Sequence, residues 1–142
     1  MPLTPDIEGS PCAILDQVSL SRLSCPTSLL NDNCMNECAK LLHSLFPSPQ
    51  ASTYALLSTY VLADHRNHTY DDHRTWRNSY KTQYWSKSKW IIPIHRLATQ
   101  HWVLCVVNRV SRHIDFFDSL GEQSAWIRDI QVSIRPLEAH CN

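Results

Sequence analysis

The chain has 142 residues and a formal net charge of +0, and this balance gives no general reason to expect nucleic acid as its partner. Hydrophobic residues make up 43% of it and charged residues 18%, which indicates one globular domain rather than a disordered chain. Only two glycines occur and no Walker or dinucleotide fingerprint is present, which argues against Gly-rich phosphate loops of those kinds.

The first 28 residues are rich in proline, serine and threonine, so we expect residues 1–28 to be a flexible N-terminal segment with one short helical turn near residues 14–23. Residues 1–10 lack the apolar core of a secretory signal, and the six cysteines are therefore expected to stay reduced. No apolar run approaches the roughly 18 residues that span a bilayer.

A helix is predicted to open at Asn31-Asp32-Asn33, because an Asn or Asp side chain caps free backbone N–H groups. Its apolar side chains recur at helical spacing up to Leu45, and Pro47 and Pro49 end it. Residues 54–63 are apolar and aromatic, and helix and strand are hard to separate there. Residues 71–87 are predicted to be helical, because aromatic residues recur every fourth position.

From residue 90 the pattern favours strands. Residues 90–92 are a short apolar strand that Pro93 is expected to end, and residues 101–107 are apolar on both faces, as in a central buried strand. A polar turn at 109–112 leads to a partner strand at 114–118. Residues 122–134 can form an amphipathic helix, which Arg135-Pro136 is expected to stop.

The predicted hairpin brings a histidine toward an aspartate. If its turn centres between Arg109 and Val110, residues whose numbers sum to 219 are opposite one another, and His101 and Asp118 form such a pair. Opposite antiparallel residues have Cβ atoms about 4.5–5.5 Å apart. An imidazole beside a carboxylate is the orienting half of a catalytic triad. The alternative is a surface His–Asp pair without a catalytic role, and a one-residue slip would separate the two.

Four short motifs in this order resemble the SUMO-protease (ubiquitin-like-protein protease) family of cysteine peptidases. Residues 90–95 are Trp-Ile-Ile-Pro-Ile-His, His101-Trp102 opens the next strand, and Asp118-Ser119-Leu120-Gly121 follows the hairpin. Upstream, Leu30-Asn31-Asp32 is similar to the start of a helix in that family. The resemblance covers about residues 29–134.

The resemblance implies an α+β, papain-like cysteine peptidase fold of the SUMO-protease type, with a mixed sheet and flanking helices, truncated at its C-terminal end, over residues 29–142. It implies that His101 draws the proton from a cysteine thiol and that Asp118 orients His101. Trp102 and Asp32 are implied as substrate-binding residues, with Trp102 as a wall of the tunnel for a Gly-Gly tail. A plain core tryptophan is the alternative role of Trp102.

The activity implied is hydrolysis of peptide or isopeptide bonds at the C-terminus of SUMO or another ubiquitin-like modifier, in the nucleus or cytoplasm. No cofactor and no metal are implied. The family's nucleophile motif, a Gln followed by Asp-Cys-Gly, has no counterpart in these residues, so no nucleophile is assigned and a partial protease domain is expected. Cys105 is expected to be a small buried apolar residue. Leu29 stands where relatives have a tryptophan, which leaves the modifier open.

Three other hypotheses remain at this point. The same groove can bind a ubiquitin-like protein without cleaving it. Residues 74–90 interleave basic and aromatic side chains, which can hold and stack a single-stranded nucleic acid. A zinc site is a weaker alternative, because the histidines at 65, 68 and 73 cluster and Cys34 and Cys38 are four residues apart, but no second pair has matching spacing.

Overall fold

The computed structural model of the chain describes residues 15–45, 49, 52–61, 82–121, 124 and 127–139. The chain divides into two compact units, Met1–Ala51 and Ser52–Asn142. None of the helices in these described ranges combines the length and the apolar character needed to cross a membrane.

The N-terminal unit contains helices α1 (Gln17–Ser24) and α2 (Asp32–Leu45). Asp16 caps α1 by accepting a hydrogen bond from the Ser19 backbone N–H at 2.7 Å. Asn31 caps α2 in the same way, because its Oδ1 accepts from the Cys34 N–H at 2.9 Å. The predicted helix start at Asn31 is therefore confirmed, whereas α1 is longer than the single turn predicted within residues 1–28.

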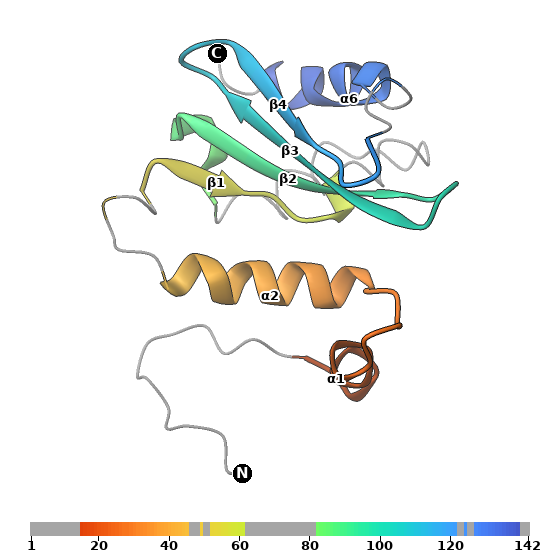
Figure 1. Cartoon of the computed structure of the whole chain (residues 1–142). Helices are drawn as coiled ribbons and strands as arrows, with labels where there is room; N and C mark the ends of the chain where they lie inside the picture. Colours follow the sequence, from red (N-terminus) through yellow and green to blue (C-terminus); the bar gives the residue numbers. More distant parts are fainter. Residues whose placement is uncertain are drawn as a thin grey trace. The chain divides into compact units, whose positions relative to one another are not determined.

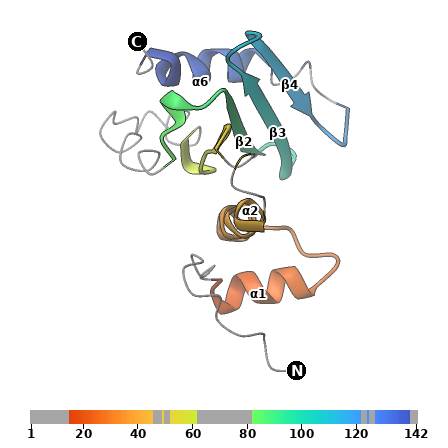
Figure 2. The ribbon, with the colours of Figure 1, turned by 90° about the vertical axis from the view of Figure 1, so that its left-hand side faces the viewer.

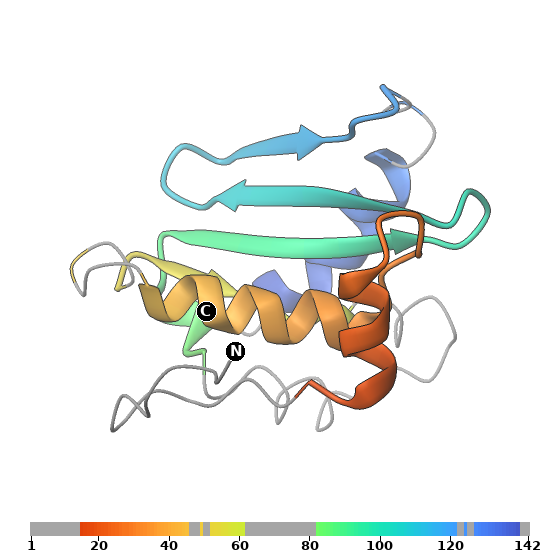
Figure 3. The same ribbon diagram turned by 60° about the horizontal axis from the view of Figure 1, so that its bottom comes forward.

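The C-terminal unit is built on a four-stranded mixed sheet in the order β1-β2-β3-β4. Its strands are β1 (Tyr54–Leu56), β2 (Lys89–Arg96), β3 (His101–Asn108) and β4 (His113–Phe117). β1 runs parallel to β2, and the other neighbouring pairs are antiparallel. Figure 3 shows β2, β3 and β4 side by side as green, teal and blue strands. The predicted strand at 101–107 and its partner are confirmed.

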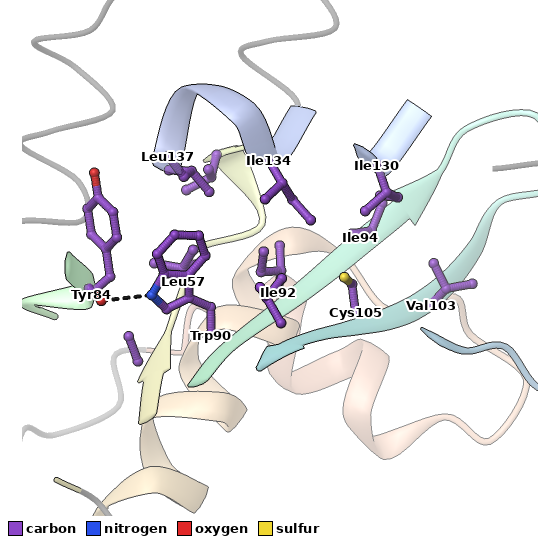
Figure 4. Packing of buried hydrophobic residues seen from close by; sticks show 13 residues of the cluster. Leu57, Tyr84, Trp90, Ile92, Ile94, Val103, Cys105, Ile130, Ile134 and Leu137 are labelled. Carbon is purple, nitrogen blue, oxygen red and sulfur yellow. Dashed lines mark hydrogen bonds between the residues drawn. The ribbon is translucent and has the colours of Figure 1, made fainter. Parts of the chain in front are cut away.

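Helix α6 (Ile127–Ala139) covers one face of this sheet (Figures 1 and 2). It contributes Ile130, Ile134 and Leu137 to the core, each at most 2% exposed. These positions recur at i, i+4 and i+7, which places them on one side of a helix. They pack in one cluster with alternate residues of β2 and β3, of which Figure 4 labels Trp90, Ile92, Ile94, Val103 and Cys105. Val107, which pairs with Trp90 across the two strands, belongs to the same cluster.

Two prolines do not end their elements as predicted. Pro93 lies inside β2, paired with Leu104. The Ile91 carbonyl faces β1, because it accepts a hydrogen bond from the Leu57 backbone N–H. The backbone polar groups of a strand alternate in direction, so the nitrogen of Pro93 faces the same side as the Ile91 carbonyl. The last pair between β1 and β2 is Leu56–Ile91, so no β1 residue is paired with Pro93. Proline is tolerated there because it removes no ladder bond. Helix α6 likewise continues past Pro136, since Leu137 anchors its last turn in the core.

The helix predicted for residues 71–87 is wrong at its C-terminal end. Residues 82–83 form a turn, followed by a single 3₁₀ turn, η1 (Tyr84–Ser86). Gln83 adopts a left-handed backbone conformation with φ 48°, which an α-helix does not accept. Residues 71–81 of this prediction lie outside the described residues. The ambiguous stretch at 54–63 begins as strand β1.

Candidate active site

The β3–β4 hairpin has a register two residues away from the predicted one. Its pairs, such as Leu104 with Phe117, sum to 221, and the closing pair Asn108–His113 leaves a four-residue turn. The prediction that His101 and Asp118 lie directly opposite each other is therefore wrong. A shift of two residues keeps every side chain on its face. His101 and Asp118 are diagonal neighbours, a spacing that long side chains can bridge.

The two side chains meet in spite of the shifted register. His101 Nε2 lies 3.0 Å from Asp118 Oδ1, at the N-terminal end of β3 and just past the end of β4. The Asp118 side chain is 0% exposed and that of His101 is 19% exposed. The imidazole thus remains accessible from solvent while its carboxylate partner is sealed off, which is an arrangement suited to proton transfer with a bound substrate.

A tight turn fixes the Asp118 carboxylate. Oδ1 also accepts from the Leu120 backbone N–H at 2.9 Å, and the Asp118 carbonyl accepts from the Gly121 N–H at 3.1 Å. Gly121 has φ +72°, a conformation that glycine adopts without strain. The Asp-Ser-Leu-Gly sequence therefore closes a turn whose side chain bonds its own backbone, and this holds the carboxylate in place.

The hydrogen bond to Asp118 also determines which ring nitrogen of His101 carries hydrogen. An ionised carboxylate only accepts hydrogen bonds, so Nε2 is the nitrogen that carries hydrogen in the neutral ring. Nδ1 is then the ring nitrogen that can take a proton from another group. Ser119 Oγ lies 3.5 Å from Nε2, at the limit of a hydrogen bond.

Sequence reasoning missed Arg96. Its Nη1 lies 3.7 Å from Asp118 Oδ2, and its side chain is 11% exposed. Arg96 is the last residue of β2 and pairs with His101 across the β2–β3 hairpin. The short loop at 97–100 between Arg96 and the histidine was the available signal, because a tight hairpin places the two residues that flank it side by side.

The structure also describes Trp102 and Asp32, the other predicted site residues. Trp102 follows His101 in β3, so its side chain lies on the opposite face of the sheet, half-buried and packed on His95 with ring centroids 4.7 Å apart. Asp32 begins α2 in the N-terminal unit. The substrate-binding roles of Trp102 and Asp32 stay predictions.

The cysteines of the described residues differ sharply in their environment. Cys105 is 0% exposed in the core, and this burial, together with the charge of Asp115, raises its pKa to about 12. It is therefore a buried apolar residue, as predicted, and is not available as a thiolate nucleophile. Cys25 is exposed, and hydrogen bonds from Ser28 and Thr27 lower its pKa to about 7. Cys141 lies outside the described residues.

These pKa values predict selective alkylation of the folded chain by iodoacetamide. Near neutral pH, Cys25 is about half thiolate and Cys105 is almost wholly thiol, because only the deprotonated sulfur is nucleophilic. We expect Cys25 to react within minutes, with a rate that rises between pH 6 and pH 8, while Cys105 reacts only after denaturation. Peptide mass spectrometry of timed samples measures both sites, and equal rates at the two cysteines contradict the prediction.

Two alternative hypotheses can be compared with the described residues. Tyr84 and Trp90, two of the aromatic residues proposed to stack nucleic acid, are 0% exposed and belong to the core. Within the described ranges no cluster of three His, Cys, Asp or Glu side chains could hold a metal ion. The histidines at 65, 68 and 73, and residues 74–81 of the nucleic-acid hypothesis, lie outside those ranges.

A histidine oriented by a buried carboxylate is typical of hydrolases that activate a nucleophile by proton transfer. Comparison with family models matches residues 29–141 to the Ulp1 protease family, C-terminal catalytic domain. The chain belongs to this family of cysteine-type peptidases, and its helices and mixed sheet agree with the predicted α+β fold. A search of the curated proteins finds no match.

Proposed function

We propose that this protein hydrolyses peptide or isopeptide bonds at the C-terminus of SUMO or another ubiquitin-like protein, with His101 as proton acceptor and Asp118 as its orienting partner. The observation that carries the proposal is the 3.0 Å contact between His101 Nε2 and the fully buried Asp118 carboxylate. Family membership supports the peptidase class and substrates of the ubiquitin-like kind. Reduced cysteines and such substrates favour the nucleus or cytoplasm.

The chemistry follows from the geometry of the pair. His101 would accept the thiol proton of a cysteine on Nδ1, and the resulting imidazolium would be stabilised by Asp118 through Nε2–H. The thiolate would then attack the carbonyl of the scissile bond, and His101 would return the proton to the departing amine. The nucleophile itself is unassigned, because the printed residues contain no Asp-Cys-Gly motif and Cys105 is buried.

The alternative function is binding of a ubiquitin-like protein without cleavage. It uses the same residues and requires no thiolate. Sequencing the transcript past the codon for Asn142 separates the two functions first. An in-frame Gln followed by Asp-Cys-Gly would favour the peptidase, and a stop codon would favour binding alone.

The direct test uses the full-length gene product and fluorogenic C-terminal conjugates of SUMO and of ubiquitin. We expect release of the fluorophore from at least one conjugate, and loss of that release after thiol alkylation. The 142-residue chain is titrated in parallel with each modifier by isothermal calorimetry. Saturable binding without release supports the alternative function, whereas neither release nor binding with both modifiers rejects the proposal.

A further inference from the structure

The Asp118 carboxylate has a separate cationic or potentially cationic partner on each of its oxygens. Oδ1 faces His101 Nε2 at 3.0 Å, and Oδ2 faces Arg96 Nη1 at 3.7 Å. The Asp118 side chain is 0% exposed. Burial of an ionised carboxylate costs free energy of desolvation unless the group is paired and hydrogen-bonded. His101 offers a full positive charge only when it is protonated, whereas Arg96 is always charged.

Three different segments bring these groups together. Arg96 ends β2, His101 begins β3 and Asp118 follows β4. Arg96 and His101 are directly paired, and cross-strand partners share a face of the sheet. Ile94 precedes Arg96 on that face and is 1% exposed, so the arginine emerges from the edge of the core. The guanidinium is thus held over the carboxylate by the sheet itself.

We infer that Arg96 is a positioning residue that keeps Asp118 ionised and turned so that Oδ1 faces the His101 ring. The neutral imidazole is the form of His101 that must accept the thiol proton. The permanent charge of Arg96 beside Oδ2 keeps the carboxylate paired with a cation while the imidazole is neutral. Without Arg96, the buried carboxylate would lose the permanent positive charge beside Oδ2. It would then take up a proton or rotate toward water, and the Nε2–H form of His101 would lose its acceptor.

The inference rests on the proposed function only where it concerns the rate of hydrolysis. The tautomer of the His101 imidazole can be measured without catalysis. The experiment compares wild type, Arg96→Gln and Arg96→Lys. Arg112→Gln is the matched control, since Arg112 is an exposed arginine in the β3–β4 turn. Ring ¹⁵N chemical shifts of His101, assigned by their loss in His101→Asn, report which nitrogen carries hydrogen.

We expect wild type and Arg112→Gln to show the Nε2–H form, Arg96→Gln a mixture of both forms, and Arg96→Lys a return toward wild type. In the full-length protein kcat is expected to fall by about tenfold to 100-fold in Arg96→Gln, with little change in KM. An unchanged tautomer in Arg96→Gln overturns the inference while leaving the peptidase proposal intact. A wild-type enzyme without hydrolysis rejects the peptidase proposal, and the tautomer comparison still tests Arg96.

A second measurement keeps the inference testable if Arg96→Gln does not fold. Asp118→Asn removes the charge that Arg96 faces, so the guanidinium resonances of Arg96 should move toward those of exposed Arg112. Guanidinium resonances that do not change between wild type and Asp118→Asn contradict the ion pair and overturn the inference.

Discussion

His101→Ala in the full-length protein is expected to lower kcat/KM for a modifier conjugate by at least about 10³-fold, because it removes the group that accepts and returns the proton. The loss should appear mainly in kcat, because the imidazole acts on the reacting atoms rather than on the bulk of the substrate. His101 is partly exposed and begins its strand, so the fold should survive. Initial rates of fluorophore release, with circular dichroism of each variant, measure the effect.

Asp118→Asn is expected to lower the same rate by about 10²- to 10⁴-fold, since an amide cannot stabilise the imidazolium by charge. The chain supplies a matched control, because His113 Nε2 lies 2.9 Å from Asp115 Oδ1 in an exposed pair of the same hairpin. His113→Ala and Asp115→Asn should retain full activity. Full activity in His101→Ala would refute the assignment, and an equal loss in the control pair would indicate a structural effect.

The sequence predicted the meeting of His101 and Asp118 for a partly incorrect reason. Alternation of side chains along the strands places both residues on one face, and any even shift of register preserves this. The turn itself could not be predicted, because residues 109–112 contain no glycine to fix its type. It closes instead through Arg112 at φ 53° and a hydrogen bond from the Ser111 N–H to Asn108 Oδ1 at 3.2 Å.

The errors at the prolines have a common physical origin. Local rules treat a proline as the end of an element because it lacks an N–H group. Whether that loss matters depends on which side of the strand its nitrogen faces and on what the following residues bury, and both are tertiary properties. Arg96 was missed for the same reason, since its partner Asp118 is 22 residues away and the contact exists only after three strands have paired.

Trp90 connects these strands to the rest of the core. Its side chain is 0% exposed, and its indole Nε1–H donates to the Tyr84 carbonyl at 2.7 Å (Figure 4). The Tyr84 ring meets it edge-on with centroids 5.5 Å apart, and the Arg109 guanidinium lies 5.2 Å from the ring centre. A single side chain thus links η1, β2 and the start of the hairpin turn through packing, a hydrogen bond and a cation–π contact.

Trp90→Ala is expected to lower the free energy of unfolding of the chain by about 3–5 kcal/mol, through lost burial and the cavity left in the core. The Tyr84 carbonyl also loses the indole N–H as a donor, which adds a smaller cost because it still accepts from the Lys87 backbone N–H at 3.1 Å. Trp102→Ala is the matched control, because its ring is half-buried on the other face of the sheet, and we expect a smaller loss of about 1–2 kcal/mol. Urea unfolding followed by circular dichroism gives both values. Equal losses in the free energy of unfolding would contradict the prediction that the core depends more on Trp90 than on Trp102.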